Sequence, residues 1–317
     1  MRWHRNHLAR GRVRGDRPSP TMLAAGALVA AGLLVGCGTS KGASGALARS
    51  RPLVGARTPP LLVVASVYPL AQLVSYIGGP DVNVVDLPGP GVQPQGLTLS
   101  PAQREELRRA ALVVYVGDGY QPEVETQAQT LPRQGHLAAL PAVSKQSLPY
   151  EFWLDPYLMA GAATSIALAL SAADPGQREQ FANGSRDFQA LAESIESDFT
   201  SSLSNCAQSY FVTADDAFAS MARAFDLVDV PVSSAGVAAA VSTVSQHQLP
   251  EIFSEDGVPS AEVDEVANKA GVKVAELDPM ETAPSPGTGA SSYFSAMEQV
   301  LGTLEGGLGC NITGSFS

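Results

Sequence analysis

The sequence predicts an α/β fold with two lobes, each built on a parallel sheet flanked by helices, and one long rigid helix joining them. Two observations predict this class. Short apolar runs alternate with helical patterns in residues 61–116 and again in residues 210–308, as is typical of parallel strands with helical crossovers. Between these regions lies a helical pattern of roughly 30 residues, about 45 Å at 1.5 Å per residue, which is long enough to serve both lobes.

The first lobe follows a βαβαβ order. Residues 61–67 form a continuous apolar run, which favours a strand buried on both faces, and Gly78-Gly79-Pro80 stops the helix that follows it. Ser100 before Pro101 marks the start of the next helix. The expected strands are 61–67, 82–87 and 112–116, and the expected helices are 70–77 and 100–109. Residues 118–150 are expected to form a loop.

The middle of the chain and the second lobe also alternate between apolar runs and helical patterns. Asp155-Pro156 and Asp174-Pro175 each begin a helix, and the second helix carries phenylalanines at helical spacing that would contact both lobes. The further expected strands are 210–213, 252–255 and 272–277, and the further expected helices are 216–225, 237–246, 260–270 and 291–308.

The N-terminus has the pattern of an export signal. Six arginines precede an apolar run over residues 22–36, which is short for a permanent membrane span. The run closes on Leu34-Val35-Gly36-Cys37, which resembles the bacterial lipobox, so Cys37 is the expected lipidation site. A plain secretory signal and a transmembrane anchor are the alternatives. The expected organisation is a lipoprotein signal peptide (1–36), a flexible tether (37–60), an N-terminal α/β lobe (61–174), a linking helix (175–205) and a C-terminal α/β lobe (206–317).

The mature chain is strongly acidic. Residues 1–36 hold six arginines and one aspartate, so their removal changes the net charge from −11 to −16. This charge repels nucleic acid, and no nucleic-acid partner is expected. The negative charge would attract cations to an acidic cleft, although solubility alone would be a sufficient reason for the chain to be acidic.

Two cysteines remain after Cys37. Cys206 and Cys310 belong to an exported chain, where oxidation is permitted, and we expect a disulfide between them. Two separate buried thiols are the alternative, and two distant cysteines are too few for a metal–thiolate site. The two histidines of the mature chain, His136 and His247, have no ligand spacing with a second histidine or cysteine.

Four short segments each place one polar residue at the end of an expected strand or on the loop after it. They are residues 90–95, 151–156, 211–218 and 276–279. Ligands of open parallel sheets gather beyond the carboxyl ends of the strands, and two facing lobes would enclose a ligand in the cleft between them. We therefore expect the four segments to converge on this cleft.

In this order and spacing the segments resemble the solute-binding lipoproteins of zinc and manganese ABC transporters, the cluster A-I proteins. In that family the first three segments usually supply histidines and the last supplies an aspartate. The matching positions here hold Gln95, Glu151, Asp215 and Asp278, so no imidazole remains. Glu255 matches a position near the family's cleft and is a possible supporting group.

Each of these residues has an ordinary alternative role. Gln95 could be a loop amide, Glu151 a solvated carboxylate, and Asp278 a turn residue before proline. Asp215 and Asp216 are adjacent, and either could cap the helix that follows. Asp215 matches the family's ligand position, so we assign the cap to Asp216.

The resemblance implies a lipid-anchored, extracytoplasmic substrate-binding component of an ABC transporter for a divalent metal, held at the outer face of a bacterial cell membrane. Its partners would be a permease and an ATPase, and we expect a monomer. Oxygen donors suit hard cations, so manganese is expected over zinc. A family member that has lost metal and serves as a scaffold, or binds another solute, is the alternative. An enzyme using Glu151 and Asp155 ranks last, because the sequence shows neither an activated nucleophile nor a Gly-rich phosphate loop.

Overall fold

The computed structural model describes residues 59–138, 150–284 and 292–310. All of them belong to one of the two compact units into which the chain divides, residues 57–317. The expected signal peptide, the expected lipidation residue Cys37 and most of the expected tether lie outside the described residues.

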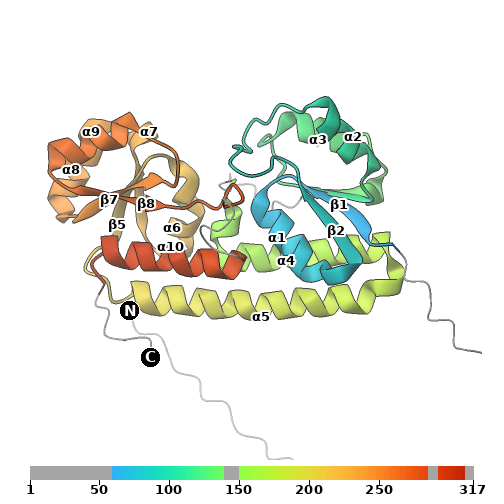
Figure 1. The fold of residues 1–317 in the computed structure, drawn as a ribbon. Coiled ribbons are helices and arrows are strands. Elements are labelled where there is room, and N and C mark those ends of the chain that lie inside the picture. Colours follow the sequence, from blue (N-terminus) through green and yellow to red (C-terminus); the bar gives the residue numbers. More distant parts are fainter. Residues whose placement is uncertain (1–58, 139–149, 285–291, 311–317) are drawn as a thin grey trace, which may run out of the picture. The chain divides into compact units, whose positions relative to one another are not determined.

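The first lobe contains a four-stranded parallel sheet in the order β2-β1-β3-β4 (Figure 1). Its elements are β1 (Leu61–Ala65), α1 (Tyr68–Gly78), β2 (Val82–Asp86), α2 (Pro101–Arg109), β3 (Leu112–Tyr115), α3 (Pro122–Ala128) and β4 (His136–Ala138), and α4 (Pro156–Ala173) and α5 (Arg178–Leu203) follow. Val63 of β1 packs with residues of α1 and α4, whereas its neighbour Val64 packs with residues of α2 and α3. The continuous apolar run of β1 is thus explained by burial on both faces.

Two local features of this lobe bear on the sequence prediction. The start of α2 is a capping box, in which Gln103 N donates to Ser100 Oγ (3.2 Å) and Ser100 N donates to Gln103 Oε1 (2.9 Å). The prediction that residues 118–150 form only a loop was wrong, because α3 and β4 lie within this region. These elements span 7 and 3 residues, too few for a periodic signal to emerge from the sequence.

The helices α4 and α5 run alongside each other (Figure 1). Asp155 caps α4 by accepting from Tyr157 N at 3.0 Å. The 26 residues of α5 make it about 39 Å long, and its Phe181, Phe188 and Phe199 are buried in a core that contains residues of both lobes. Within the described part of the chain, α4 is long and apolar enough to cross a membrane, but half of it is buried in the protein.

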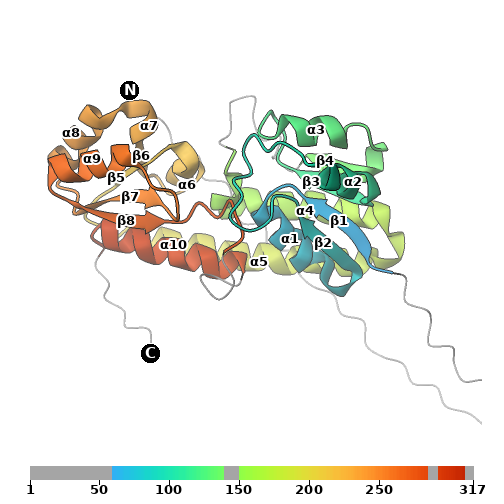
Figure 2. The ribbon, with the colours of Figure 1, turned by 45° about the horizontal axis from the view of Figure 1, so that its top comes forward.

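The second lobe holds two parallel strand pairs, β5-β6 and β7-β8. Its elements are β5 (Tyr210–Thr213), α6 (Ala219–Ala224), β6 (Val228–Pro231), α7 (Val232–Ala235), α8 (Val237–His247), β7 (Glu251–Glu255), α9 (Ala261–Ala270), β8 (Lys273–Leu277) and α10 (Tyr293–Gly307). Figure 2 shows the strands between α10 on one side and α7, α8 and α9 on the other. Phe211 accordingly belongs to the core that includes α10, and Val212 to the core that includes α8 and α9. The sequence did not indicate β6, whose run of four residues is interrupted by Asp229 and closed by Pro231.

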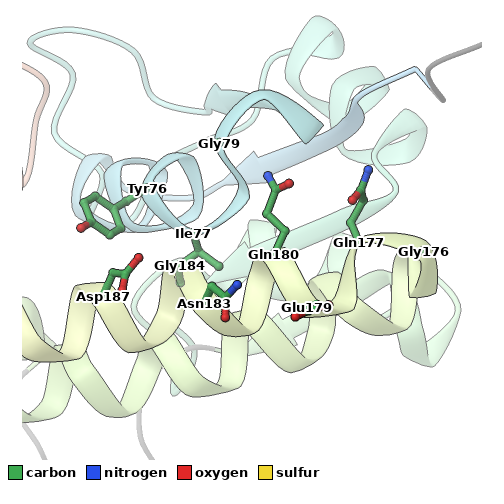
Figure 3. Close-up of a pocket in the computed structure, with 10 residues that line it drawn as sticks. All are labelled: Tyr76, Ile77, Gly79, Gly176, Gln177, Glu179, Gln180, Asn183, Gly184 and Asp187. Atoms are coloured by element: carbon green, nitrogen blue, oxygen red, sulfur yellow. The ribbon is translucent and has the colours of Figure 1, made fainter. Parts of the chain in front are cut away.

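The C-terminal end of α1 lies directly against α5 at Gly184 (Figure 3). A Cβ atom built on Gly184 would lie 2.6 Å from the carbonyl oxygen of Ile77, so only glycine permits this approach. Gln180 Nε2 donates to the carbonyl oxygen of Gly78 at 3.3 Å and so satisfies one group at the end of α1. A hollow of 530 Å³ lies beside this contact. It is lined by residues at the end of α1 and at the start of α5.

A disulfide joins Cys206 and Cys310, which are 104 residues apart. Cys206 follows the end of α5, and Cys310 follows the end of α10. The backbones of the two cysteines also form an isolated antiparallel bridge. The covalent link therefore ties the last helix to the start of the second lobe.

Asp229 of β6 is a carboxylate with one unsatisfied oxygen. Its Oδ1 accepts from Thr213 Oγ1 at 2.6 Å, whereas its buried Oδ2 has no partner. Burial raises the pKa of Asp229 to about 7, and the negative charges of Asp215 and Asp216 add to the effect. The folded state thus binds this proton more tightly than the unfolded state does. The stability that this proton contributes is complete below pH 4 and is lost as the pH rises to 7.

Asp229→Asn is expected to flatten this pH dependence. Asparagine keeps the acceptor for Thr213 and cannot ionise, so the variant should gain on the order of 2 kcal/mol relative to wild type between pH 4 and pH 8. Urea unfolding of both proteins across this range, with a chelator present, measures the difference. Parallel stability curves for the two proteins would show that Asp229 does not titrate in this range.

Candidate functional site

An acidic cavity of 660 Å³ lies where the two lobes meet. Its lining residues are Gln93, Gln95, Asp118, Tyr150, Glu151, Asp215, Asp216, Ala217, Ala219, Glu255, Val258 and Glu281. Six of these side chains are carboxyl groups, and none is lysine or arginine. The lining comes from loops after the strands of both lobes, the usual place for ligands of parallel sheets. The cavity therefore favours a positively charged ligand.

Three of the four residues singled out in the sequence line this cavity. Gln95 lies on the exposed loop after β2, Glu151 lies just before α4 and is 8% exposed, and Asp215 follows β5. Glu255, at the end of β7, also lines the cavity and is 7% exposed. Neither His136 nor His247 is among the lining residues.

Asp215 and Asp216 have the opposite capping roles from those predicted. The backbone of Asp215 is extended, and its Oδ1 accepts from Ala217 N at 3.0 Å, so Asp215 caps the turn that leads into α6. Asp216 is exposed at the start of this turn and also lines the cavity. Capping uses Oδ1 of Asp215, and the same carboxyl group lies beside Glu255 at the cavity.

Asp278 requires a correction, because it is not among the residues that line the cavity. Its Oδ1 accepts from the backbone N–H of Met280 at 2.7 Å, and Met280 has a left-handed backbone with φ of 58°. This tight turn directs the Asp278 carboxylate to its own chain, as its alternative role as a turn residue implied.

Glu281 lines the cavity instead, and no pattern in the sequence indicated it. Tyr120 Oη donates to Glu281 Oε1 at 3.3 Å, and the Glu281 carboxyl group lies beside that of Glu151. Tyr120 belongs to the first lobe and Glu281 follows the last strand of the second lobe. Glu281 of the second lobe therefore contacts the first lobe across the cavity.

The carboxyl groups lie in two neighbouring pairs, Glu151 with Glu281 and Glu255 with Asp215. Burial raises the pKa of Glu151, Glu255 and Glu281, and the neighbouring negative charges act in the same direction. Ionised carboxylates so close together repel one another, and a bound cation would relieve this repulsion.

The structure does not contain a ready-made metal shell. Among the residues that it describes, no three His, Cys, Asp or Glu side chains are grouped so as to hold a metal ion. The expected convergence of three carboxylates within a few ångströms is therefore not seen. The donors are instead spread over two pairs, so a single ion would need side-chain movement to contact more than one pair.

Two buried hydrogen bonds anchor the segment that carries Glu151. The fully buried Trp153 donates from Nε1 to the carbonyl oxygen of Pro279 at 2.8 Å. Tyr293 Oη of α10 donates to the carbonyl oxygen of Trp153 at 2.9 Å. The segment that carries Glu151 is thus attached to the turn that precedes Glu281.

The fold and the cavity together define a class. Two parallel α/β lobes, joined by one long helix and enclosing a polar cavity at their strand ends, have the architecture of α/β solute-binding proteins. The family model for the zinc-uptake complex component A, periplasmic, matches residues 63–307, and the chain belongs to this family. The family consists of solute-binding proteins of ABC transporters, which are not enzymes.

Curated relatives are distant in sequence. The chain is 24% identical over 276 residues to the zinc-binding lipoprotein AdcA of Streptococcus pneumoniae strain R6, covering 77% of this chain and 55% of AdcA. It is 21% identical over 281 residues to the high-affinity zinc uptake system protein ZnuA of Bacillus subtilis, covering 78% of this chain and 88% of ZnuA. The chain thus spans about half the length of the AdcA relatives that it matches.

Solved structures share the fold. The Zn(II)-bound ZnuA-like domain of S. pneumoniae AdcA is similar with a TM-score of 0.68 at 23% identity, covering 78% of this chain and 99% of that domain. The periplasmic zinc-binding protein TroA of Treponema pallidum is similar with a TM-score of 0.71 at 22% identity, with the same coverage. At these identities the similarity shows the fold alone.

Proposed function

We propose that this chain is the extracytoplasmic, lipid-anchored substrate-binding component of an ABC transporter for a divalent metal ion. The observation that supports it most is the position of Gln95, Glu151 and Asp215. They stand where the family places ligands, and they line one acidic cavity. Cys37 would carry the lipid, a permease and an ATPase would be the partners, and the protein would act as a monomer.

The donor atoms favour a hard cation. The relatives above are named for zinc, but zinc sites are typically rich in nitrogen and sulfur donors. The lining side chains here offer carboxylate, amide and phenol oxygens and no imidazole. Oxygen donors of this kind suit Mn²⁺, Mg²⁺ or Ca²⁺, and we propose Mn²⁺ over Zn²⁺ as the cargo.

Capture of the ion would require no chemistry beyond proton release. The carboxyl groups already line the cavity, and a divalent cation would neutralise their charge. Small displacements of the side chains, and of the lobes that carry them, would bring the pairs around one ion.

The absence of a ready-made shell among the described residues favours one alternative. In that alternative the protein has kept the fold but lost metal, and it acts as a scaffold or binds another solute.

The receptor function and this alternative differ in one measurement. A receptor saturated at 100 times its dissociation constant gains about 2.7 kcal/mol, so its melting temperature should rise with at least one of Mn²⁺, Zn²⁺, Mg²⁺ and Ca²⁺. An unchanged melting temperature with all four ions would exclude the receptor function.

Asp215→Asn is expected to weaken Mn²⁺ binding by about tenfold or more, because it removes a charged oxygen from the ion's shell. Asparagine can still cap the turn at Ala217, so the fold should persist. Isothermal titration calorimetry measures the dissociation constant. Asp187→Asn on α5 is the matched control, because it removes the same charge far from the cavity. Equal affinities in the two variants would remove Asp215 from the site.

A further inference from the structure

We propose that the groove between α4 and α5 is a self-association surface, on which a second copy of this chain docks about a two-fold axis that crosses both helices at Thr164 and Gln189. This inference goes beyond the proposed function and does not depend on metal binding. The residues of this groove are not among those that line the acidic cavity. One copy would still capture its ion alone, and pairing would place two receptors side by side.

The exposed face of α4 is apolar. The helix is apolar enough to cross a membrane, yet only half of it is buried in the protein. Leu168 and Tyr157 are 68% and 67% exposed, the largest fractions among the exposed large hydrophobic side chains of the described residues. Two hollows of 310 and 550 Å³ lie between α4 and α5 on this face, and Thr164 and Gln189 line both of them. Exposed apolar surface of this kind marks an interaction site.

The apolar features are spaced symmetrically about Thr164. Leu168 and Ala160 lie four residues to either side of it, and the proposed axis would set Leu168 of one copy over Ala160 of the other. Ala160 lines the hollow of 310 Å³. Tyr157 and Ser171 lie seven residues to either side, and Ser171 lines the hollow of 550 Å³. Each exposed side chain would thus meet a hollow of the second copy, as an interface that uses the same patch twice requires.

The charges along α5 are complementary about the same axis. Arg186 lies three residues before Gln189, and Glu193 lies four residues after it. Arg178 and Glu196 extend the basic end and the acidic end of the groove. The ion pairs within the described part of the chain include none of these four charged side chains. With each α5 antiparallel to its counterpart, basic ends would face acidic ends, which favours a second copy as the occupant.

The length of the groove limits the strength of this contact. The 18 residues of α4 span about 27 Å. A contact confined to two helices of each copy lies at the small end of stable interfaces. Pairing is therefore expected to be weak in dilute solution and to be favoured when both copies are attached to one membrane, because attachment raises their effective concentration.

A cysteine at Thr164 tests the arrangement, because a residue on a two-fold axis meets its own counterpart. Packed helices have axes about 8–10 Å apart, which brings the two Cα atoms within reach of a disulfide. In the full-length chain reconstituted into lipid vesicles and mildly oxidised, Thr164→Cys is expected to form cross-linked dimers about tenfold faster than Ser245→Cys. Ser245 of α8 is the matched control, because both hydroxyl groups donate to the carbonyl group four residues earlier in an exposed helix. Wild type reports any background from Cys37.

Charge reversal tests the orientation of the second copy. In the Thr164→Cys background, Arg186→Glu is expected to slow cross-linking by about threefold or more, because it places like charges together twice in each dimer. Glu193→Arg alone should slow it similarly, and the two reversals together should restore the rate. Both side chains are exposed, so these variants should fold.

The outcomes separate this inference from the proposed function. Cross-linking of Thr164→Cys that is no faster than that of Ser245→Cys overturns the inference. Fast cross-linking that charge reversal leaves unchanged, or that the double reversal does not restore, also overturns it, since the two-fold arrangement would then be wrong. The Mn²⁺ dissociation constant should be the same in all these variants, so a failure of pairing and a failure of metal capture are distinguishable.

Discussion

Replacing Cys206 and Cys310 together by serine is expected to lower the free energy of unfolding by about 3 to 4 kcal/mol. The disulfide closes a loop of 104 residues, and a cross-link of that length removes much of the freedom of the unfolded chain. It also holds the end of α10 against the start of the second lobe. Guanidinium unfolding of both proteins measures the change.

Two comparisons make this result specific. Wild type treated with a reductant should lose the same stability, whereas the serine variant should be indifferent to the reductant. The Mn²⁺ dissociation constant should be the same in both, because neither cysteine lines the cavity. Two reactive thiols in native wild type with Cys37 blocked would contradict the bridge.

Gly184→Ala is expected to destabilise the protein by about 2 to 3 kcal/mol. The added methyl group would stand 2.6 Å from the Ile77 carbonyl oxygen, which belongs to the backbone of α1 and cannot rotate away. Either α1 must shift from α5 or the helices must bend. Because α1 packs on β1 and β2, such a shift would propagate into the first sheet.

Gly161→Ala is the matched control. Gly161 also lies inside a helix, α4, but a methyl group there would meet nothing within 4 Å. Since alanine is the better helix former, this variant should gain about 0.5 to 1 kcal/mol. Thermal unfolding of both variants gives the comparison, and equal effects of the two substitutions would refute the close contact.

Helix starts and buried strands could be predicted from local sequence. Ser100 and Asp155 cap helices as their side chains and the following prolines indicate. The phenylalanines of α5 show their helical spacing without any knowledge of their partners. The short elements could not be predicted in this way, because β4 and β6 depend on neighbouring strands rather than on their own composition.

Part of the candidate site could be predicted from the sequence. Gln95, Glu151 and Asp215 reach the cavity as the sequence pattern indicates. Asp278 and Glu281 differ because a three-residue turn with a left-handed methionine decides which carboxylate faces inward. That conformation depends on tertiary contacts such as the hydrogen bond from Trp153 to Pro279, and no residue type in the local sequence indicates it.

Trp153 has a consequence for relative movement of the two lobes. Its ring hydrogen-bonds to the turn of one lobe while its carbonyl group is held by the last helix. Both bonds join the segment that carries Glu151 to the second lobe, so a rotation of the lobes that preserves them would leave this junction in place.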